Sequence, residues 1–328
     1  MPLTISEERE AQPAEWDEIW RGCEYATYFH SREWAEIWCQ YTGGALRPGA
    51  RLIRFSDGRR ALLALSYEER YHRWLRHYYS APAGTFGGWI STEALRIEHG
   101  RLLTDYLRRR LASLEWRLNP YDPLSATVPI RGRSDRTQVL DLEAGAEAVL
   151  RGFSRGHRSA INKARRQGVA VGPATRRSDW EAYFRLYRAS LARWGERATS
   201  EYGWELFGLM FESKSPRIKL WLAWHQHEPL AGALCFYAPR HAVYWHGAAA
   251  AEGFAARPAT LLLTEVILDA CRQGYRWFDF NPSGGHPGVE QFKARFGARS
   301  LQADVIRLES RRARCLRRLW ICLHRAAA

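Results

Sequence analysis

The sequence predicts an α+β fold made of two domains, each with a mixed, largely antiparallel sheet flanked by helices. Three observations lead to this class. A length of 328 residues leaves room for about two domains. Residues 146–309 show helices, then strands in close succession, and then alternating helices and strands. Residues 1–145 show a weaker copy of that order, so we place the domain boundary near Gly145.

The first domain is predicted from periodicity and turn signals. Apolar residues at steps of three and four predict helices over 15–20 and 31–38, and Ser31 is placed to cap the second helix. The turn signal Asp57-Gly58 separates the two strands of a β-hairpin, 51–55 and 60–67. The remaining elements of this domain are a helix over 92–111 and strands over 115–118 and 138–142.

The second domain alternates more regularly. Its predicted helices cover 146–152, 155–168, 179–194, 202–212 and 259–272. Its predicted strands cover 218–224, 230–237, 242–247, 277–280 and 303–308. Short polar or proline-containing links join the first of these strands, which indicates an antiparallel meander. One more helix precedes the last strand, and residues 310–328 are predicted to form a basic C-terminal helix.

Charge is the strongest compositional feature of the chain. A net charge of +14, with 49 Lys and Arg, attracts polyanions such as nucleic acid, an anionic membrane or a phosphate-bearing cofactor. Charges that only solvate the surface are the alternative. No apolar run approaches the roughly 20 residues of a membrane span. Acids near the start, where a signal peptide carries basic residues, predict a cytoplasmic protein. The scattered cysteines lack metal-ligand spacing, so no metal site is predicted.

Motifs in the second domain resemble those of one protein family. The stretch Phe-Asp-Phe-Asn-Pro-Ser at 278–283 precedes Val-Glu-Gln-Phe-Lys-Ala-Arg-Phe-Gly at 289–297, and a basic helical segment covers 158–169. Together with the order of elements, these motifs are similar to those of the Fem-like proteins of the GNAT superfamily. That family carries two tandem GNAT folds and includes peptidoglycan-bridge aminoacyltransferases and related acyltransferases. The resemblance implies an acyltransferase with an acceptor-side first domain and a donor-side second domain.

The donor is predicted from a missing loop. GNAT enzymes that use acyl-CoA place an (R/Q)-x-x-G-x-(G/A) loop at a helix N-terminus, where backbone N–H groups hold the pyrophosphate. Residues 248–260 lie at the corresponding place and lack this pattern. The absence favours aminoacyl-tRNA as the donor, with acyl-CoA as the alternative and no bound cofactor. The expected partners are tRNA and a small-molecule or cell-envelope precursor as the acceptor.

Three residues are candidates for catalysis. The lysine that matches Lys293 faces the donor in the resembled family, where its charge stabilises the oxyanion of acyl transfer. A solvated helical lysine is the alternative. Asp279 ends a strand between two aromatic residues, and it either accepts a proton or caps the following loop. His246 lies on the third central strand, either as a base or as a half-buried structural histidine.

The predicted donor-binding residues lie near Lys293 in the sequence. Asn281 and Ser283 belong to a loop with two glycines, which let a ligand approach the backbone closely. Phe292 and Arg295 lie in the same short helix as Lys293. Arg295 projects about 200° away from Lys293, so a structural role or a tRNA contact is its alternative.

The predicted phosphate- and acceptor-binding residues lie on two segments. Arg158, Lys163 and Arg165 belong to the basic helix, whose exposed face would hold phosphates of tRNA or of a nucleotide-linked acceptor. Ile161 is expected at the margin of that face, and a merely solvated basic face is the alternative. Tyr79 belongs to a segment that looks like the family's acceptor-side loop.

The C-terminal segment combines charge with an apolar stripe. Residues 307–325 carry seven arginines against one acid, and an apolar stripe of Leu316, Leu319, Trp320 and Leu323 runs beside the charge. A helix of this kind lies on an anionic membrane, along tRNA, or against the second domain. The first of these alternatives predicts a peripheral location at the inner membrane face.

Transfer of an aminoacyl group from aminoacyl-tRNA to an amine, with formation of an amide bond, is the leading hypothesis for the function. The first alternative is an acyl-CoA-dependent N- or O-acyltransferase that acts on a cell-envelope or exopolysaccharide sugar. The second is a non-catalytic GNAT-like binding protein.

Overall fold

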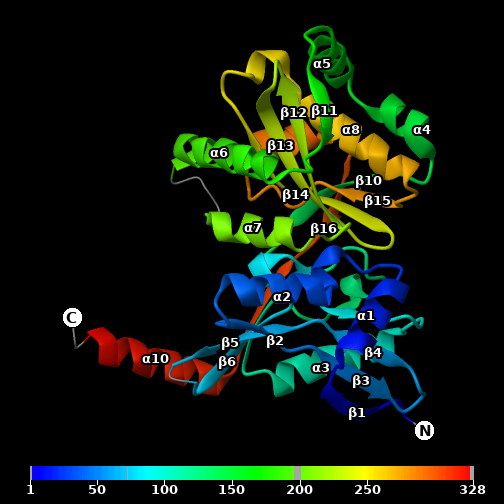
Figure 1. The fold of residues 1–328 in the computed structure, drawn as a ribbon. Helices are drawn as coiled ribbons and strands as arrows, with labels where there is room; N and C mark the ends of the chain where they lie inside the picture. The colour runs from blue at the N-terminus through cyan, green and yellow to red at the C-terminus, as the bar shows by residue number, and fades with distance from the viewer. Residues whose placement is uncertain (1, 72, 196–200, 326–328) are drawn as a thin grey trace. The chain divides into compact units, whose positions relative to one another are not determined.

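The computed structural model describes residues 2–71, 73–195 and 201–325. It divides the chain into two compact units, which we call unit 1 (Met1–Asp135 with Gln302–Ala328) and unit 2 (Arg136–Leu301). Both units combine β-sheets with flanking helices, so the predicted α+β class is confirmed (Figure 1). Residues 326–328 of the predicted basic helix lie outside the described residues. Within those described residues, no helix is both long and apolar enough to cross a membrane.

The predicted domain boundary near Gly145 assigns two strands to a different half of the chain from the unit in which the structure places them. Strand β10 (Arg136–Asp141) pairs with β15 (Trp277–Asp279) in unit 2. Strand β17 (Val305–Glu309) pairs with β9 (Ser113–Leu118) in unit 1. Each unit is therefore completed by a strand from beyond the predicted boundary. Pairing between strands far apart in sequence leaves no local signal in the chain, because the residue pattern of a strand does not determine which other strand it pairs with.

Unit 1 contains two sheets. The first has the order β1-β3-β4-β8 and the second β17-β9-β6-β5-β2, with β7 also beside β9. The remaining strands are β1 (Ile5–Glu10), β2 (Leu46–Pro48), β3 (Arg51–Phe55), β4 (Arg60–Leu63), β5 (Ser66–Arg70), β6 (Leu75–Tyr79), β7 (Phe86–Gly87) and β8 (Trp89–Ile90). The helices are α1 (Pro13–Gly22), α2 (Arg32–Tyr41), α3 (Ile97–Arg110) and α10 (Arg311–Arg325). Helix α10 belongs to unit 1, not to the second domain against which one of the three alternatives placed it.

Local signals placed several elements of unit 1 correctly. Ser31 caps α2, because its Oγ accepts a hydrogen bond from the backbone N–H of Trp34 at 3.1 Å. Strands β3 and β4 form the predicted antiparallel hairpin, with Gly58 in the turn at a φ of 88°. Helix α3 begins at Ile97, after the predicted start, because Glu93 accepts hydrogen bonds from the Ser91 hydroxyl and from the backbone of Arg60.

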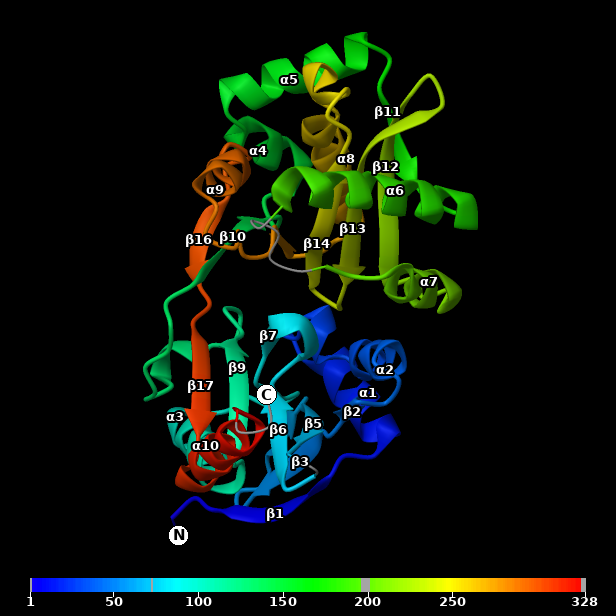
Figure 2. The ribbon, with the colours of Figure 1, turned by 90° about the vertical axis from the view of Figure 1, so that its left-hand side faces the viewer.

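Unit 2 is built on one seven-stranded sheet with the order β11-β12-β13-β14-β15-β10-β16 (Figure 2). Strands β14 and β15 run parallel, while β11 to β14 form antiparallel pairs. The strands not yet given are β11 (Ala170–Pro173), β12 (Ile218–His225), β13 (Glu228–Tyr237), β14 (His241–Ala249) and β16 (Arg299–Gln302). The helices are α4 (Gly145–Gly152), α5 (Arg155–Arg166), α6 (Arg177–Trp194), α7 (Trp204–Glu212), α8 (Pro258–Arg272) and α9 (Pro287–Ala294).

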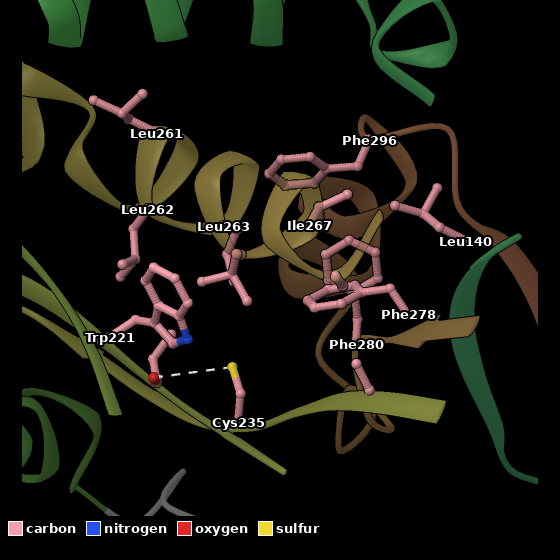
Figure 3. Packing of buried hydrophobic residues seen from close by; sticks show 14 of the residues in the cluster. Leu140, Trp221, Cys235, Leu261, Leu262, Leu263, Ile267, Phe278, Phe280 and Phe296 are labelled. Atoms are coloured by element: carbon pink, nitrogen blue, oxygen red, sulfur yellow. Dashed lines mark hydrogen bonds between the residues drawn. The ribbon is translucent and has the colours of Figure 1, made fainter. Parts of the chain in front are cut away.

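Helix α8 covers one face of this sheet and forms a large buried core with it. Leu263 and Ile267 of α8 pack with Phe278, Phe280 and Phe296, and all five side chains are at most 2% exposed (Figure 3). The ring centroids of Phe278 and Phe280 lie 5.0 Å apart, and those of Phe280 and Phe296 lie 5.4 Å apart. Burial of each such side chain stabilises the fold by about 1.5–3 kcal/mol. The aromatic residues of the two sequence motifs are thus core residues that hold β15 and the end of α9 against α8.

Gly297, which ends the second motif, is required by a close approach of two backbones. Its φ is 82°, and a Cβ at this position would lie 2.8 Å from the carbonyl oxygen of Gly152 at the end of α4. We expect Gly297→Ala to lower the free energy of unfolding by about 2 kcal/mol or more, since the left-handed conformation alone costs an alanine roughly 1–2 kcal/mol. Urea denaturation measures this loss.

Gly274→Ala is the matched control for this substitution. Gly274 has a φ of 77°, but nothing lies within 4 Å of a Cβ built on it. The control therefore reports the conformational cost without the clash. Equal losses of stability in the two variants would contradict the close approach.

Candidate active site

The candidate site lies where the parallel strands β14 and β15 part. The two strands pair only between 241–243 and 277–279, and β14 then continues to Ala249 without β15 beside it. The chain after β15 forms a loop that leads into α9 at Pro287. Asn281 of this loop donates a hydrogen bond from its side-chain nitrogen to the carbonyl oxygen of Trp245 in β14, at 3.4 Å. The loop is thereby held beside the free edge of β14.

Lys293 is buried, with 3% of its surface exposed, although it lies on a short helix. Its Nζ donates a hydrogen bond to the carbonyl oxygen of Asn281 at 2.6 Å. Asn281 has a left-handed φ of 59°, a conformation that asparagine tolerates better than most residues. The alternative of a solvated helical lysine is therefore wrong. The Lys293 side chain is therefore held from α9 against a loop of fixed conformation, where its amino group is positioned in advance to stabilise negative charge.

Asp279 is fully buried on the face of β15 opposite Phe278 and Phe280. Its Oδ1 accepts hydrogen bonds from the Thr137 hydroxyl at 2.5 Å and from the backbone N–H of Asn281 at 2.6 Å. The carboxyl group thus caps the loop that carries Asn281, as the structural alternative predicted. A catalytic role for Asp279 stays a prediction.

His246 lies among aromatic side chains of α6 and α7. Its Nδ1 shares a hydrogen bond with the hydroxyl of Tyr183, and the rings of Tyr187 and Phe207 lie 4.5 Å and 5.7 Å from it, centroid to centroid. Burial lowers the pKa of His246 to about 4. The imidazole is therefore neutral at pH 7. It can accept a proton, but its low pKa makes it a weak base.

Gln138 is a residue of this region that sequence reasoning missed. Its side chain is 1% exposed, and its Oε1 accepts a hydrogen bond from the hydroxyl of Ser283 at 2.8 Å. Its backbone carbonyl accepts the N–H of Phe280 at 2.9 Å, which ties β10 to the loop. Among the residues that the structure describes, no group pairs with the Gln138 Nε2. A buried amide with an unpaired donor is uncommon. A glutamine at the start of a predicted strand carries no signal of such a role.

Phe292 and Arg295 flank Lys293 but point away from it. Phe292 packs its ring on His157 and Phe296, at centroid distances of 5.2 Å and 5.4 Å. Arg295 is exposed, on another face of α9 than Lys293, as the helical geometry predicts. These contacts support structural roles, and donor binding by either residue stays a prediction.

The basic helix α5 turns Ala164 toward the core, as expected, but its inward face also includes Ile161. Ile161 is buried in the core with His157 and Ala164, so its predicted place at the margin of the exposed face is wrong. The period of 3.6 residues centres the inward face on these three residues.

Two arginines of α5, Arg158 and Arg165, contact neighbouring elements. The guanidinium of Arg158 donates to the backbone carbonyls of Arg151, at 3.2 Å, and of Phe153. It caps the C-terminal end of α4, where the helix dipole favours a cation. Arg165 forms an ion pair of 2.8 Å with Glu265 of α8. Lys163 is exposed, and in the described part of the chain no carboxylate pairs with it. Phosphate binding by these three residues stays a prediction.

Tyr79 lies in unit 1, whereas the other predicted site residues lie in unit 2. Its hydroxyl donates to Glu68 Oε1 at 3.0 Å and accepts from Arg70 at 2.9 Å. Burial, together with the charge of Glu68, raises its pKa to about 12. The hydroxyl is therefore protonated and held by partners on β5.

Comparison with known proteins identifies the domain in unit 2. Residues 151–294 match the family described as acetyltransferase (GNAT) domain. FemX has a similar fold, with a TM-score of 0.67 at 13% identity over 91% of this chain and 96% of its own. L-PGS from Bacillus licheniformis has a TM-score of 0.55 at 12% identity, over 92% and 93% of the two chains.

A third similar structure is the C-terminal domain of a putative lysylphosphatidylglycerol synthetase from Agrobacterium fabrum. Its TM-score is 0.50 at 11% identity, over 82% of this chain and 86% of that one. No curated protein matches the chain in sequence. Unit 2 therefore carries a GNAT acetyltransferase domain, and the chain has a fold similar to that of FemX. The predictions of a GNAT-type fold and of an acyltransferase are confirmed.

The depressed pKa of His246 makes the stability of the protein depend on pH. An unfolded histidine has a pKa near 6.5, so between about pH 4 and 6.5 the unfolded state binds more protons than the folded state. The stabilisation is fully present above about pH 6.5 and is lost as the pH falls toward 4. We expect the difference in unfolding free energy between the protein and a His246→Gln variant to grow as the pH rises through this window. Urea denaturation at several pH values measures the difference, and a constant value would contradict burial of a neutral imidazole.

Proposed function

We propose that the protein transfers an aminoacyl group from aminoacyl-tRNA to an amine acceptor and forms an amide bond. The observation that carries the acyl-transfer step is the buried ammonium of Lys293 at the Asn281 carbonyl, beside the free edge of β14. Acyl transfer develops negative charge on the carbonyl oxygen of the donor, and a fixed cation in a water-excluded place stabilises that charge.

The reaction needs no ATP, because an ester bond is exchanged for an amide. The amine nitrogen attacks the ester carbonyl carbon and forms the new C–N bond. The C–O bond to the ribose then breaks, and the ribose hydroxyl leaves with the proton that the amine loses. Lys293 would stabilise the intermediate oxyanion. Asp279 holds the loop in place through the N–H of Asn281.

The N-terminus of α8 supports a donor other than acyl-CoA. The helix begins with Pro258, which has no N–H, and Arg257 precedes it in a left-handed conformation. A pyrophosphate cradle needs several free N–H groups at this place. The net charge of +14 and the exposed Arg155, Lys163 and Arg166 of α5 favour a nucleic-acid donor.

The similar folds agree with this proposal. A lysylphosphatidylglycerol synthetase is, by its name, an enzyme that makes an aminoacylated phospholipid. A cytoplasmic location and a small-molecule or cell-envelope acceptor complete the proposal, because charged tRNA is a cytoplasmic donor.

An acyl-CoA-dependent N- or O-acyltransferase that modifies a sugar is the second candidate. The description of the matched family as an acetyltransferase domain favours it. The same Lys293 would stabilise the same oxyanion, so the two candidates differ in the donor alone. A non-catalytic GNAT-like protein is a third candidate, and the two experiments below separate all three.

The donor is tested by supplying each candidate donor separately. We expect the protein, with tRNA charged with radiolabelled amino acids and a panel of amines, to form labelled amides. Digestion of the charged tRNA with ribonuclease before the reaction should abolish the product. Acetyl-CoA with the same amines should give none. A product from acetyl-CoA and none from charged tRNA would replace the first candidate by the second.

Lys293→Met tests catalysis, because methionine keeps the length of the side chain and removes its charge. We expect kcat/KM to fall by about 10²–10³-fold, the typical effect of removing one oxyanion-stabilising group. Gln291→Met on the exposed face of α9 is the matched control and should retain activity. Thermal denaturation shows whether each variant folds. A folded Lys293→Met variant with unchanged turnover would exclude the proposed role of Lys293.

A further inference from the structure

One surface of unit 1 carries large apolar side chains among arginines, and the proposed reaction uses none of them. Trp74, in the turn between β5 and β6, is 68% exposed, and Leu319 of α10 is 60% exposed. Together with Arg110 and Arg312 they form what we call the basic patch. Single exposed apolar residues are ordinary, but a tryptophan and a leucine among arginines form a surface with two chemical characters.

Helix α10 is fixed to unit 1 by one of its faces. Its first turn is capped by Ser310, whose Oγ accepts the N–H of Ala313 at 3.1 Å, and Ala313 is completely buried. Farther along, the ring of Trp320 packs against Tyr71 in the β5–β6 turn at 5.5 Å. Figures 1 and 2 show α10 beside β6 in both views. These contacts hold one face of α10 against unit 1.

The exposed residues of α10 and of the β5–β6 turn lie together. Trp74, Arg110 and Arg312 line one shallow hollow of about 180 Å³. Leu319 follows Arg312 by two helical turns, so both project from the same side of α10. The basic patch thus joins residues from three separate elements, α3, α10 and the β5–β6 turn.

Carboxylates compensate part of the charge of this surface, since Arg110 forms an ion pair with Glu8 of β1 at 3.1 Å. The sequence of α10 contains no Asp or Glu, and Arg317 pairs with Glu309 of β17 at 3.0 Å. No such pair is formed by Arg312 or Arg318 with any carboxylate in the described residues. The arginines therefore present an electropositive face.

We propose that the basic patch docks the protein on an anionic lipid bilayer. Arginines attract anionic headgroups, tryptophan favours the membrane–water interface, and leucine gains from entering the acyl boundary. A nucleic acid would contact the arginines and stack on Trp74, but it would provide no apolar environment for the exposed Leu319. This surface lies in a different unit from Lys293, so the proposal stands independently of the donor.

Vesicle flotation tests the proposal. We expect the full-length protein to float with vesicles of phosphatidylcholine and phosphatidylglycerol and not with phosphatidylcholine alone, and to bind less as the salt concentration rises. Trp74→Ala, Leu319→Ala and Arg312→Glu should each reduce binding about threefold or more, and the triple variant at least tenfold. Ile97→Ala, at an exposed apolar residue of the same unit, and Arg21→Glu, at an exposed arginine of α1, are the matched controls and should bind like the unaltered protein.

Three outcomes would overturn the proposal. The first is a failure of the unaltered protein to float with anionic vesicles. The second is equal binding by the folded patch variants and the controls, with folding checked by circular dichroism. The third is a loss of tRNA binding in gel-shift assays of Trp74→Ala and Arg312→Glu without any vesicle binding by the unaltered protein. That result would make the patch a nucleic-acid surface.

Discussion

The packing of three aromatic rings under α8 is the constraint on which the unit 2 site depends. Phe278 and Phe280 enter the core from one face of β15, so the alternation of the strand sends Asp279 to the other face. There Asp279 accepts the N–H of Asn281 and sets the conformation of the loop. Phe296 joins the same core from the end of α9 and turns Lys293 inward. Apolar packing thus positions polar groups that do not themselves belong to the core.

Burying the polar groups of the site costs free energy, and each of these groups therefore forms hydrogen bonds. Removing an ammonium or a carboxylate from water costs several kcal/mol unless the group finds partners. Lys293 donates a hydrogen bond to the Asn281 carbonyl oxygen, and Asp279 accepts hydrogen bonds from the Thr137 hydroxyl and the Asn281 N–H. The Ser283 hydroxyl donates to the Gln138 side chain. One loop of a few residues receives contacts from β10, β14, β15 and α9. Such convergence gives a preorganised environment, which electrostatic catalysis requires.

The sequence predicted what depends on local patterns. The helices with clear periodicity, the Ser31 cap and the outward turn of Arg295 all follow from spacing along one element. Short edge strands such as β1 and β16 escaped prediction because they alternate weakly and are partly exposed. Ile161 was placed wrongly because α5 rotates to bury His157 beside two phenylalanines. Gln138 could not be found, because its role arises from a strand pairing between residues far apart in the chain.

The exchange of β10 and β17 across the predicted boundary has a consequence for protein synthesis. The first 135 residues leave the ribosome long before β17, which is the strand that covers the outer edge of β9. During translation that edge of β9 stays open to other chains, and exposed strand edges promote aggregation. Unit 1 reaches its final sheet only after unit 2 has been made. The order of translation therefore leaves the outer edge of β9 unpaired until residues 305–309 have been made.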